Sequence, residues 1–115
     1  MTSPFAGVLA TLVRHRGVAG CLVVDERDGT IVDAVLQVGV DGAAVAALTG
    51  SLYRRARHAV AAAGYGEAGF FEIEAERGRV CAAGRNGLVL VVVAEPRVNV
   101  GLVRIEMQRA IEAFS

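Results

Sequence analysis

The chain has 115 residues, of which 12 are basic and 12 are acidic, so its formal net charge is zero. This length predicts one domain, residues 1–115, and the balanced charge argues against a nucleic-acid-binding protein, which normally carries a basic excess. Hydrophobic residues make up 54% of the chain, above the roughly 45–50% of an average soluble domain, so we expect some apolar surface to be buried against another chain.

The N-terminal third predicts a helix followed by a β-hairpin. Ser3 followed by Pro4 is typical of a helix start, and apolar residues at helical spacing predict a helix over about 4–16. The nearly continuous apolar run 18–25 predicts a strand that is buried on both faces. An Asp-Gly turn then returns the chain into a second strand over 30–38.

A long helix is predicted next. Asp41 can cap its N-terminus, and the apolar and small residues continue to about Ala63, where Gly64 ends the helix. Gly50 lies inside it, where glycine costs about 1 kcal/mol relative to alanine. We therefore expect another backbone to approach the helix closely at Gly50.

A meander of three strands follows, over 67–76, 79–85 and 88–94. Arg77-Gly78 predicts the first tight turn, and Asn86-Gly87 predicts the second, because both residues of that pair tolerate positive φ. The third strand is nearly all valine and leucine, so we expect it in the centre of a sheet.

Asn99 can cap a last helix, which is predicted over about 99–114. The order of elements is therefore αββαβββα, an α+β fold in a single domain. We expect strands 18–25 and 88–94 in the sheet centre and strands 30–38 and 67–76 at its edges.

The edge strand 67–76 predicts self-association. Its residues alternate, so Phe71 and Ile73 face one side while Glu72 and Glu74 face the other, together with Phe70. A long edge strand with two phenylalanines is a template for pairing with another chain. The alternative is a solvated strand whose glutamates pair within the chain, with Glu76 opposite Arg79. For a homodimer we expect an interface that includes Phe70, Phe71, Glu72, Ile73, Glu74 and Gly50.

No arrangement of residues predicts catalysis. The stretch 64–69 matches GxGxxG, but its glycines end a helix and open a strand, whereas a dinucleotide fingerprint does the reverse. The chain has no lysine, so it cannot form a P-loop. Cys21 and Cys81 lack the spacing of a metal site or redox motif. We expect no enzyme activity, no cofactor, no metal and two buried free thiols.

One cluster, midway along the long helix, has three open interpretations. Between Asp41 and Glu67 no acidic residue balances its arginines, and Tyr and Arg are enriched at binding hot spots. The cluster is either a solvated helix face, or a face whose arginines pair with the glutamates of the nearby strand 67–76, or a docking surface for a partner. Its candidate partner-binding residues are Tyr53, Arg54, Arg57 and His58.

The order and spacing of several motifs resemble the roadblock (dynein light-chain) family. The resemblance rests on the strand GCLVVD at 20–25, the alanine-rich helix after Asp41, FEIE at 71–74 and NGL at 86–88. The segment EPRVNVGLVR at 95–104 is similar to the family's "pdaNlGlar" segment. Each motif is weak alone, but together they cover essentially the whole chain.

This resemblance implies a profilin-like, five-stranded, mostly antiparallel sheet with the long helix on one face and the terminal helices on the other. It also implies a homodimer with a continuous ten-stranded sheet and adjacent long helices. Bacterial and archaeal members resemble partners of small Ras-like GTPases, regulating nucleotide state or location. By that likeness, the long-helix surface around Tyr53, Arg54 and Arg57 would face the GTPase.

Two further expectations concern location and an alternative role. No targeting segment or apolar run of about 20 residues is visible, so we expect no membrane span and a cytoplasmic protein. The alternative role is a small-ligand sensor or a general interaction module without a GTPase partner. A sensor predicts a closed apolar cavity with a few convergent polar groups.

Overall fold

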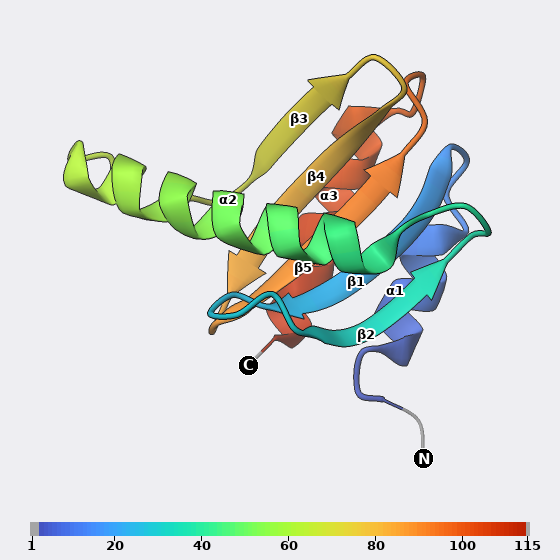
Figure 1. Ribbon diagram of the computed structural model, residues 1–115, viewed down its shortest axis with the longest axis horizontal. Coiled ribbons are helices and arrows are strands. Elements are labelled where there is room, and N and C mark those ends of the chain that lie inside the picture. The colour runs from blue at the N-terminus through green and yellow to red at the C-terminus, as the bar shows by residue number, and fades with distance from the viewer. Residues whose placement is uncertain (1–2, 115) are drawn as a thin grey trace.

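The computed structural model describes residues 3–114 and contains one five-stranded sheet between two helical layers (Figure 1). The elements, in chain order, are α1 (Ala6–Val13), β1 (Val18–Asp25), β2 (Ile31–Leu36), α2 (Gly42–Ala62), β3 (Phe71–Ala75), β4 (Gly78–Arg85), β5 (Leu88–Ala94), α3 (Val100–Ala110) and a short 3₁₀ helix (Ile111–Ala113). The predicted order αββαβββα is therefore confirmed.

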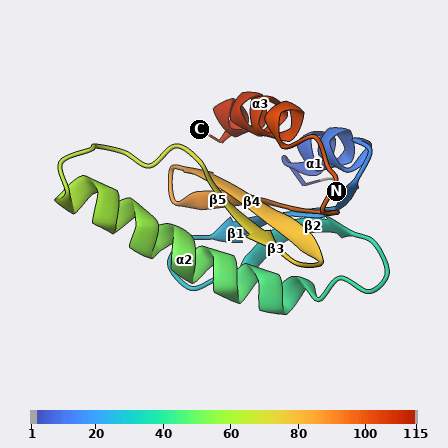
Figure 2. The same ribbon diagram turned by 90° about the horizontal axis from the view of Figure 1, so that it is seen from above.

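The strands follow the order β2-β1-β5-β4-β3, and every neighbouring pair is antiparallel. Figure 2 shows α2 on one face of this sheet and α1 with α3 on the other. The central positions of β1 and β5 and the edge positions of β2 and β3 are as predicted, because the two central strands are the most apolar segments of the chain.

The sheet separates two apolar layers. Leu9, Leu12, Val103, Met107 and Phe114 pack on the side of α1 and α3, and Ala46 and Tyr53 pack on the side of α2.

The two cysteines lie on the strands that flank β5 in the sheet. Cys21 and Cys81 both pair with Val92 of β5, one from each side, so a whole strand separates the two thiols. Both thiols are buried and free. Burial raises the pKa of Cys21 to about 12 and that of Cys81 to about 11.

Two predicted helix caps are confirmed, and one predicted helix start is corrected. Asp41 Oδ1 accepts the backbone N–H of Ala44 at 3.1 Å, and Asn99 Oδ1 accepts that of Leu102 at 3.1 Å. α1 begins at Ala6 instead of Pro4. Ser3 Oγ accepts the backbone N–H of Phe5 at 3.1 Å, which stabilises a turn before the helix.

The turn between β3 and β4 also differs from the prediction. Ala75 pairs with Gly78, so Glu76 and Arg77 are the two turn residues and Gly78 belongs to β4. A Cβ on Gly78 would lie 2.8 Å from the carbonyl oxygen of Ala94, so the glycine serves close packing between strands. β3 begins only at Phe71, after a connection from α2 without regular structure.

Candidate interaction surface

Strand β3 forms a free edge of the sheet. It pairs with β4 on one side only, and in an antiparallel ladder alternate backbone N–H and C=O groups point away from the paired strand. Phe71 and Ile73 are half-buried and share one face of β3, as predicted. This is the α2 side, where the Phe71 ring meets the Tyr53 ring edge-to-face with centroids 6.0 Å apart. Apolar side chains and free backbone groups therefore lie together along this edge.

The glutamates of β3 are bound within the chain. Arg79 Nη1 lies 2.8 Å from Glu72 Oε2, and Arg79 Nη2 lies 3.5 Å from Glu74 Oε1. Arg79 Nε also donates to the carbonyl oxygen of Pro96 at 3.0 Å. The hydrogen bond to Glu72 raises the pKa of Arg79. Pairing within the chain is thus what the structure contains, but the residue opposite Arg79 is Glu74 instead of the predicted Glu76.

Phe70 lies just before β3 and faces the α3 layer. Its ring packs against the core on that side, and the guanidinium carbon of Arg104 lies 5.0 Å from the ring centroid. A cation over an aromatic face is attracted by the ring quadrupole. Phe70 is therefore anchored within its own chain, and only part of its surface is open to a second chain.

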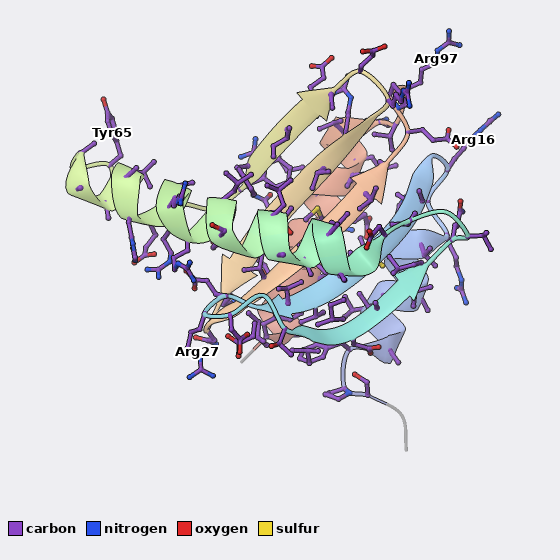
Figure 3. All side chains as sticks on the ribbon, viewed as in Figure 1. Arg16, Arg27, Tyr65 and Arg97 are labelled. Carbon is purple, nitrogen blue, oxygen red and sulfur yellow. The ribbon has the colours of Figure 1, made fainter. Side chains whose placement is uncertain are left out.

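The sheet face on the α2 side is only partly covered. Figure 1 shows α2 crossing the sheet and its C-terminal turns projecting beyond the sheet. Figure 3 shows Tyr65 beyond the end of the helix, pointing away from the sheet. Near the β3–β4 turn the surface is hollowed by an open depression of about 280 Å³. Most of its lining is apolar, but three charged residues also border it: Ala19, Ala75, Gly78, Val80, Val93 and Ala94 lie beside Arg77, Arg79 and Glu95.

The structure buries Tyr53, which corrects the expectation that its side chain is free to dock a partner. The residue is 3% exposed, and its hydroxyl donates to the carbonyl oxygen of Ala68 at 3.2 Å. Burial raises the pKa of Tyr53. Gly84 of β4 lies under the ring, where a Cβ would be 2.5 Å from Cε1. Tyr53 therefore anchors α2 and the α2–β3 connection to the sheet.

Arg54 and Arg57 bind the β1–β2 loop. Arg54 Nη1 donates to the carbonyl oxygens of Glu26 and Arg27 at 3.1 and 2.7 Å. Arg57 Nε lies 2.7 Å from Glu26 Oε1, and this hydrogen bond raises the pKa of Arg57. The Glu26 side chain is only 12% exposed, so the pair is shielded on one side. These arginines thus fix the loop to α2, while His58 remains exposed.

Gly50 also faces the β1–β2 loop. A Cβ on Gly50 would lie 3.5 Å from the Cα of Gly29, so the close backbone approach predicted at Gly50 comes from the same chain. Gly50 is buried on the inner side of α2. The contact that Gly50 makes is therefore within its own chain, and its expected place in a dimer interface stays a prediction.

An open cleft of about 520 Å³ lies between the second half of α2, the β1–β2 loop and the β4–β5 hairpin. It is lined by Glu26, Tyr53, Arg57, Glu67, Ala68, Gly84, Arg85, Asn86 and Gly87. This cleft is open to solvent and carries charges of both signs. It therefore differs from the closed apolar cavity that the small-ligand-sensor hypothesis predicts.

Within residues 3–114 no three His, Cys, Asp or Glu side chains are grouped as metal ligands. In the same part of the chain no helix has both the length and the apolar character to cross a membrane.

Sequence reasoning missed Glu26 and Gly84. Glu26 is 31 residues from the arginine that it binds, and no local spacing connects the two. Gly84 lies in a strand pattern, where an isolated glycine indicates close approach of another group. That signal predicts a contact at Gly84 but does not identify Tyr53 as its partner.

No family model matches the chain. It is 33% identical to the Methanocaldococcus jannaschii protein MJ1340 over 105 residues, which cover 91% of each chain. Its fold is similar to that of a roadblock/LC7 domain from Streptomyces avermitilis, with a TM-score of 0.83, 18% identity and coverage of 93% of this chain and 91% of that chain. Myxococcus xanthus MglB gives a TM-score of 0.81 at 20% identity, covering 97% of this chain and 94% of that chain.

Proposed function

Because this chain belongs to the same family as the archaeal protein MJ1340 and has the roadblock/LC7 fold, we propose that it is a non-catalytic, homodimeric module. We further propose that the dimer binds a small Ras-like GTPase and modulates its nucleotide state or location. The GTPase follows from the family resemblance in the sequence, and the dimer rests on the geometry of one sheet face.

The dimer proposal rests on two features of the same chain that fit each other: the projecting end of α2 and the part of the sheet that α2 does not cover. α2 projects beyond its sheet, and the sheet has an apolar depression that α2 leaves open (Figure 1). A two-fold axis beside β3 would pair the two β3 strands and carry the projecting end of each α2 over the open part of the other sheet. Such an isologous interface buries both features at once.

The proposed interface centres on Phe71 and Ile73. Glu72 and Glu74 contribute backbone groups, because their side chains are held by Arg79 on the other face. Phe70 contributes at the end of the strand. The ten strands of two such sheets would then form one continuous sheet with the two α2 helices side by side on one face.

The proposed GTPase-binding surface is the outer side of α2. His58 and Arg55 are exposed there, and the nearby loop presents Arg27, whose side chain is 86% exposed. The guanidinium groups of Arg54 and Arg57 bind the β1–β2 loop, so in this proposal they hold the loop in place and are not the main contacts to the partner. The Arg55 guanidinium on this surface suits an acidic patch on the GTPase, whereas Arg27 already pairs with Asp25 of its own chain.

New negative charges on the outer side of α2 test the proposed GTPase-binding surface, and a charge reversal at the opposite end of the molecule serves as the control. We expect Arg55→Glu with His58→Glu to weaken binding of a purified small Ras-like GTPase at least tenfold, measured by biolayer interferometry with GDP and with a GTP analogue. The matched control is Arg97→Glu, because Figure 3 shows Arg97 at the opposite end of the molecule from Arg27. Equal affinities for the α2 variant and the control would reject this surface.

The dimer is tested separately by Ile73→Asp, which places a charge on the apolar side of β3. We expect light scattering to give twice the 12.0 kDa chain mass for the wild type and one chain mass for the variant. A wild type that remains a monomer at high concentration would reject the dimer and the GTPase-binding platform built on it.

A further inference from the structure

The sheet has a second free edge, strand β2, on the side opposite β3. Ile31, Val32 and Val35 of this strand are 37%, 46% and 37% exposed. Exposed apolar edge strands are the usual sites at which another chain adds a strand. If the proposed dimer pairs β3 with β3, an open β2 would let the sheets continue from dimer to dimer without limit.

Asp33 supplies the one charged side chain of β2. Its Oδ1 accepts the backbone N–H of Ala34 at 2.8 Å. The backbone N–H of Gln37 donates to Ala19 of β1 at 3.0 Å. Hydrogen-bonded and non-hydrogen-bonded pairs alternate along an antiparallel ladder, and Ala34 is an odd number of residues from Gln37, so its N–H faces the open edge. The carboxylate thus occupies a donor that an added strand needs.

The two edges therefore differ in the placement of their carboxylates. On β3, Glu72 and Glu74 are turned toward Arg79 on the sheet face. On β2, the carboxylate of Asp33 lies on a backbone donor of the edge itself. A carbonyl oxygen of an incoming strand would have to displace this carboxylate and would meet a negative charge at the same place.

We infer that Asp33 closes the β2 edge to a second copy of this chain, so that the sheet extends only through β3. The edge contact itself is independent of the proposed dimer, but its consequence, a closed dimer instead of an open chain of sheets, rests on that proposal. Asp33 is therefore a determinant of assembly size.

The test is the particle mass of Asp33→Val over a wide range of protein concentrations, measured by light scattering and sedimentation velocity. We expect a mass that rises with concentration to at least twice the wild-type mass. Asp33→Asn keeps an oxygen acceptor for the Ala34 N–H and should keep the wild-type mass. The matched control is Gln108→Val, which adds an exposed valine on α3 and should leave the mass unchanged.

A second substitution identifies the edge. Ala34→Pro removes the outward N–H at a position where an edge strand tolerates proline, so Asp33→Val with Ala34→Pro should return to the wild-type mass. A wild-type mass for Asp33→Val, or equal association of the double variant or of Gln108→Val, would overturn the inference. If Asp33→Val does not fold by circular dichroism, Asp33→Ala gives the same test without added bulk.

These outcomes separate the inference from the dimer proposal. A wild type of one chain mass would reject the dimer, while association of Asp33→Val alone would still support closure of the β2 edge. A dimeric wild type with an unchanged Asp33→Val mass would leave the dimer in place and reject the role of Asp33.

Discussion

Replacement of Gly84 by alanine should destabilise the protein through Tyr53. The added Cβ would lie 2.5 Å from Cε1 of the tyrosine ring and 2.7 Å from its hydroxyl oxygen. The ring is 3% exposed and meets the Phe71 ring edge-to-face, so moving it away from a new Cβ would disturb this packing and the hydrogen bond to Ala68. Overpacking of this kind lowers the free energy of unfolding by about 1–3 kcal/mol. For a domain of this size, each kcal/mol corresponds to a drop of roughly 4 °C in Tm.

A double-mutant cycle isolates the cause. Tyr53→Ala alone should cost about 3–5 kcal/mol, because a buried aromatic ring is lost. In that background Gly84→Ala has no ring to displace, so its cost should fall to a few tenths of a kcal/mol. The coupling free energy is then about 1–3 kcal/mol. Urea unfolding followed by far-UV circular dichroism measures all four proteins, at one protein concentration because the stability of the proposed dimer would depend on it. Additive costs would refute the proposed contact.

Three other contacts give predictions that simple measurements check. Asp41→Ala removes the cap of α2 and should lower the free energy of unfolding by about 1 kcal/mol, seen as a lower urea midpoint with an unchanged slope. Cys21 and Cys81 should not react with a thiol reagent at pH 8 in the native protein and should both react in urea, because burial raises their pKa values to about 12 and 11; rapid native labelling would contradict the buried thiols. Arg57→Met should lower the urea midpoint slightly, since it leaves the Glu26 carboxylate without its part-exposed partner, and Arg57→Met with Glu26→Gln should recover part of that loss.

Much of the fold could be predicted because local signals and long-range packing agree. The apolar runs of β1 and β5 predict their central positions, and Asp41 and Asn99 mark helix starts that their side chains do cap. The α1 start and the β3–β4 turn were misplaced by about two residues and one residue. At both places the chain order is right, and the boundary depends on hydrogen bonds and pairing register that composition does not specify.

The site was less predictable because residues that are neighbours in the sequence of a helix can lie on opposite sides of it. Tyr53 lies beside three arginines in sequence, yet its ring lies on the inner side of α2 and theirs extend to the loop and to solvent. The prediction also allowed the arginines to pair with nearby glutamates, and Arg57 does so with Glu26. That glutamate comes from the β1–β2 loop instead of the expected β3 strand, because tertiary contact brings together residues far apart in sequence.

Arg79 and Arg104 join the free edge of the sheet to the opposite layer. Arg79 contacts β3 glutamates and the carbonyl oxygen of Pro96, just before α3, and Arg104 of α3 lies over the ring that precedes β3. The edge strand is thereby joined to α3 through Phe70 and to the β5–α3 connection through Arg79. The free edge and the α3 layer therefore share two cationic side chains, so the position of one bears on the position of the other.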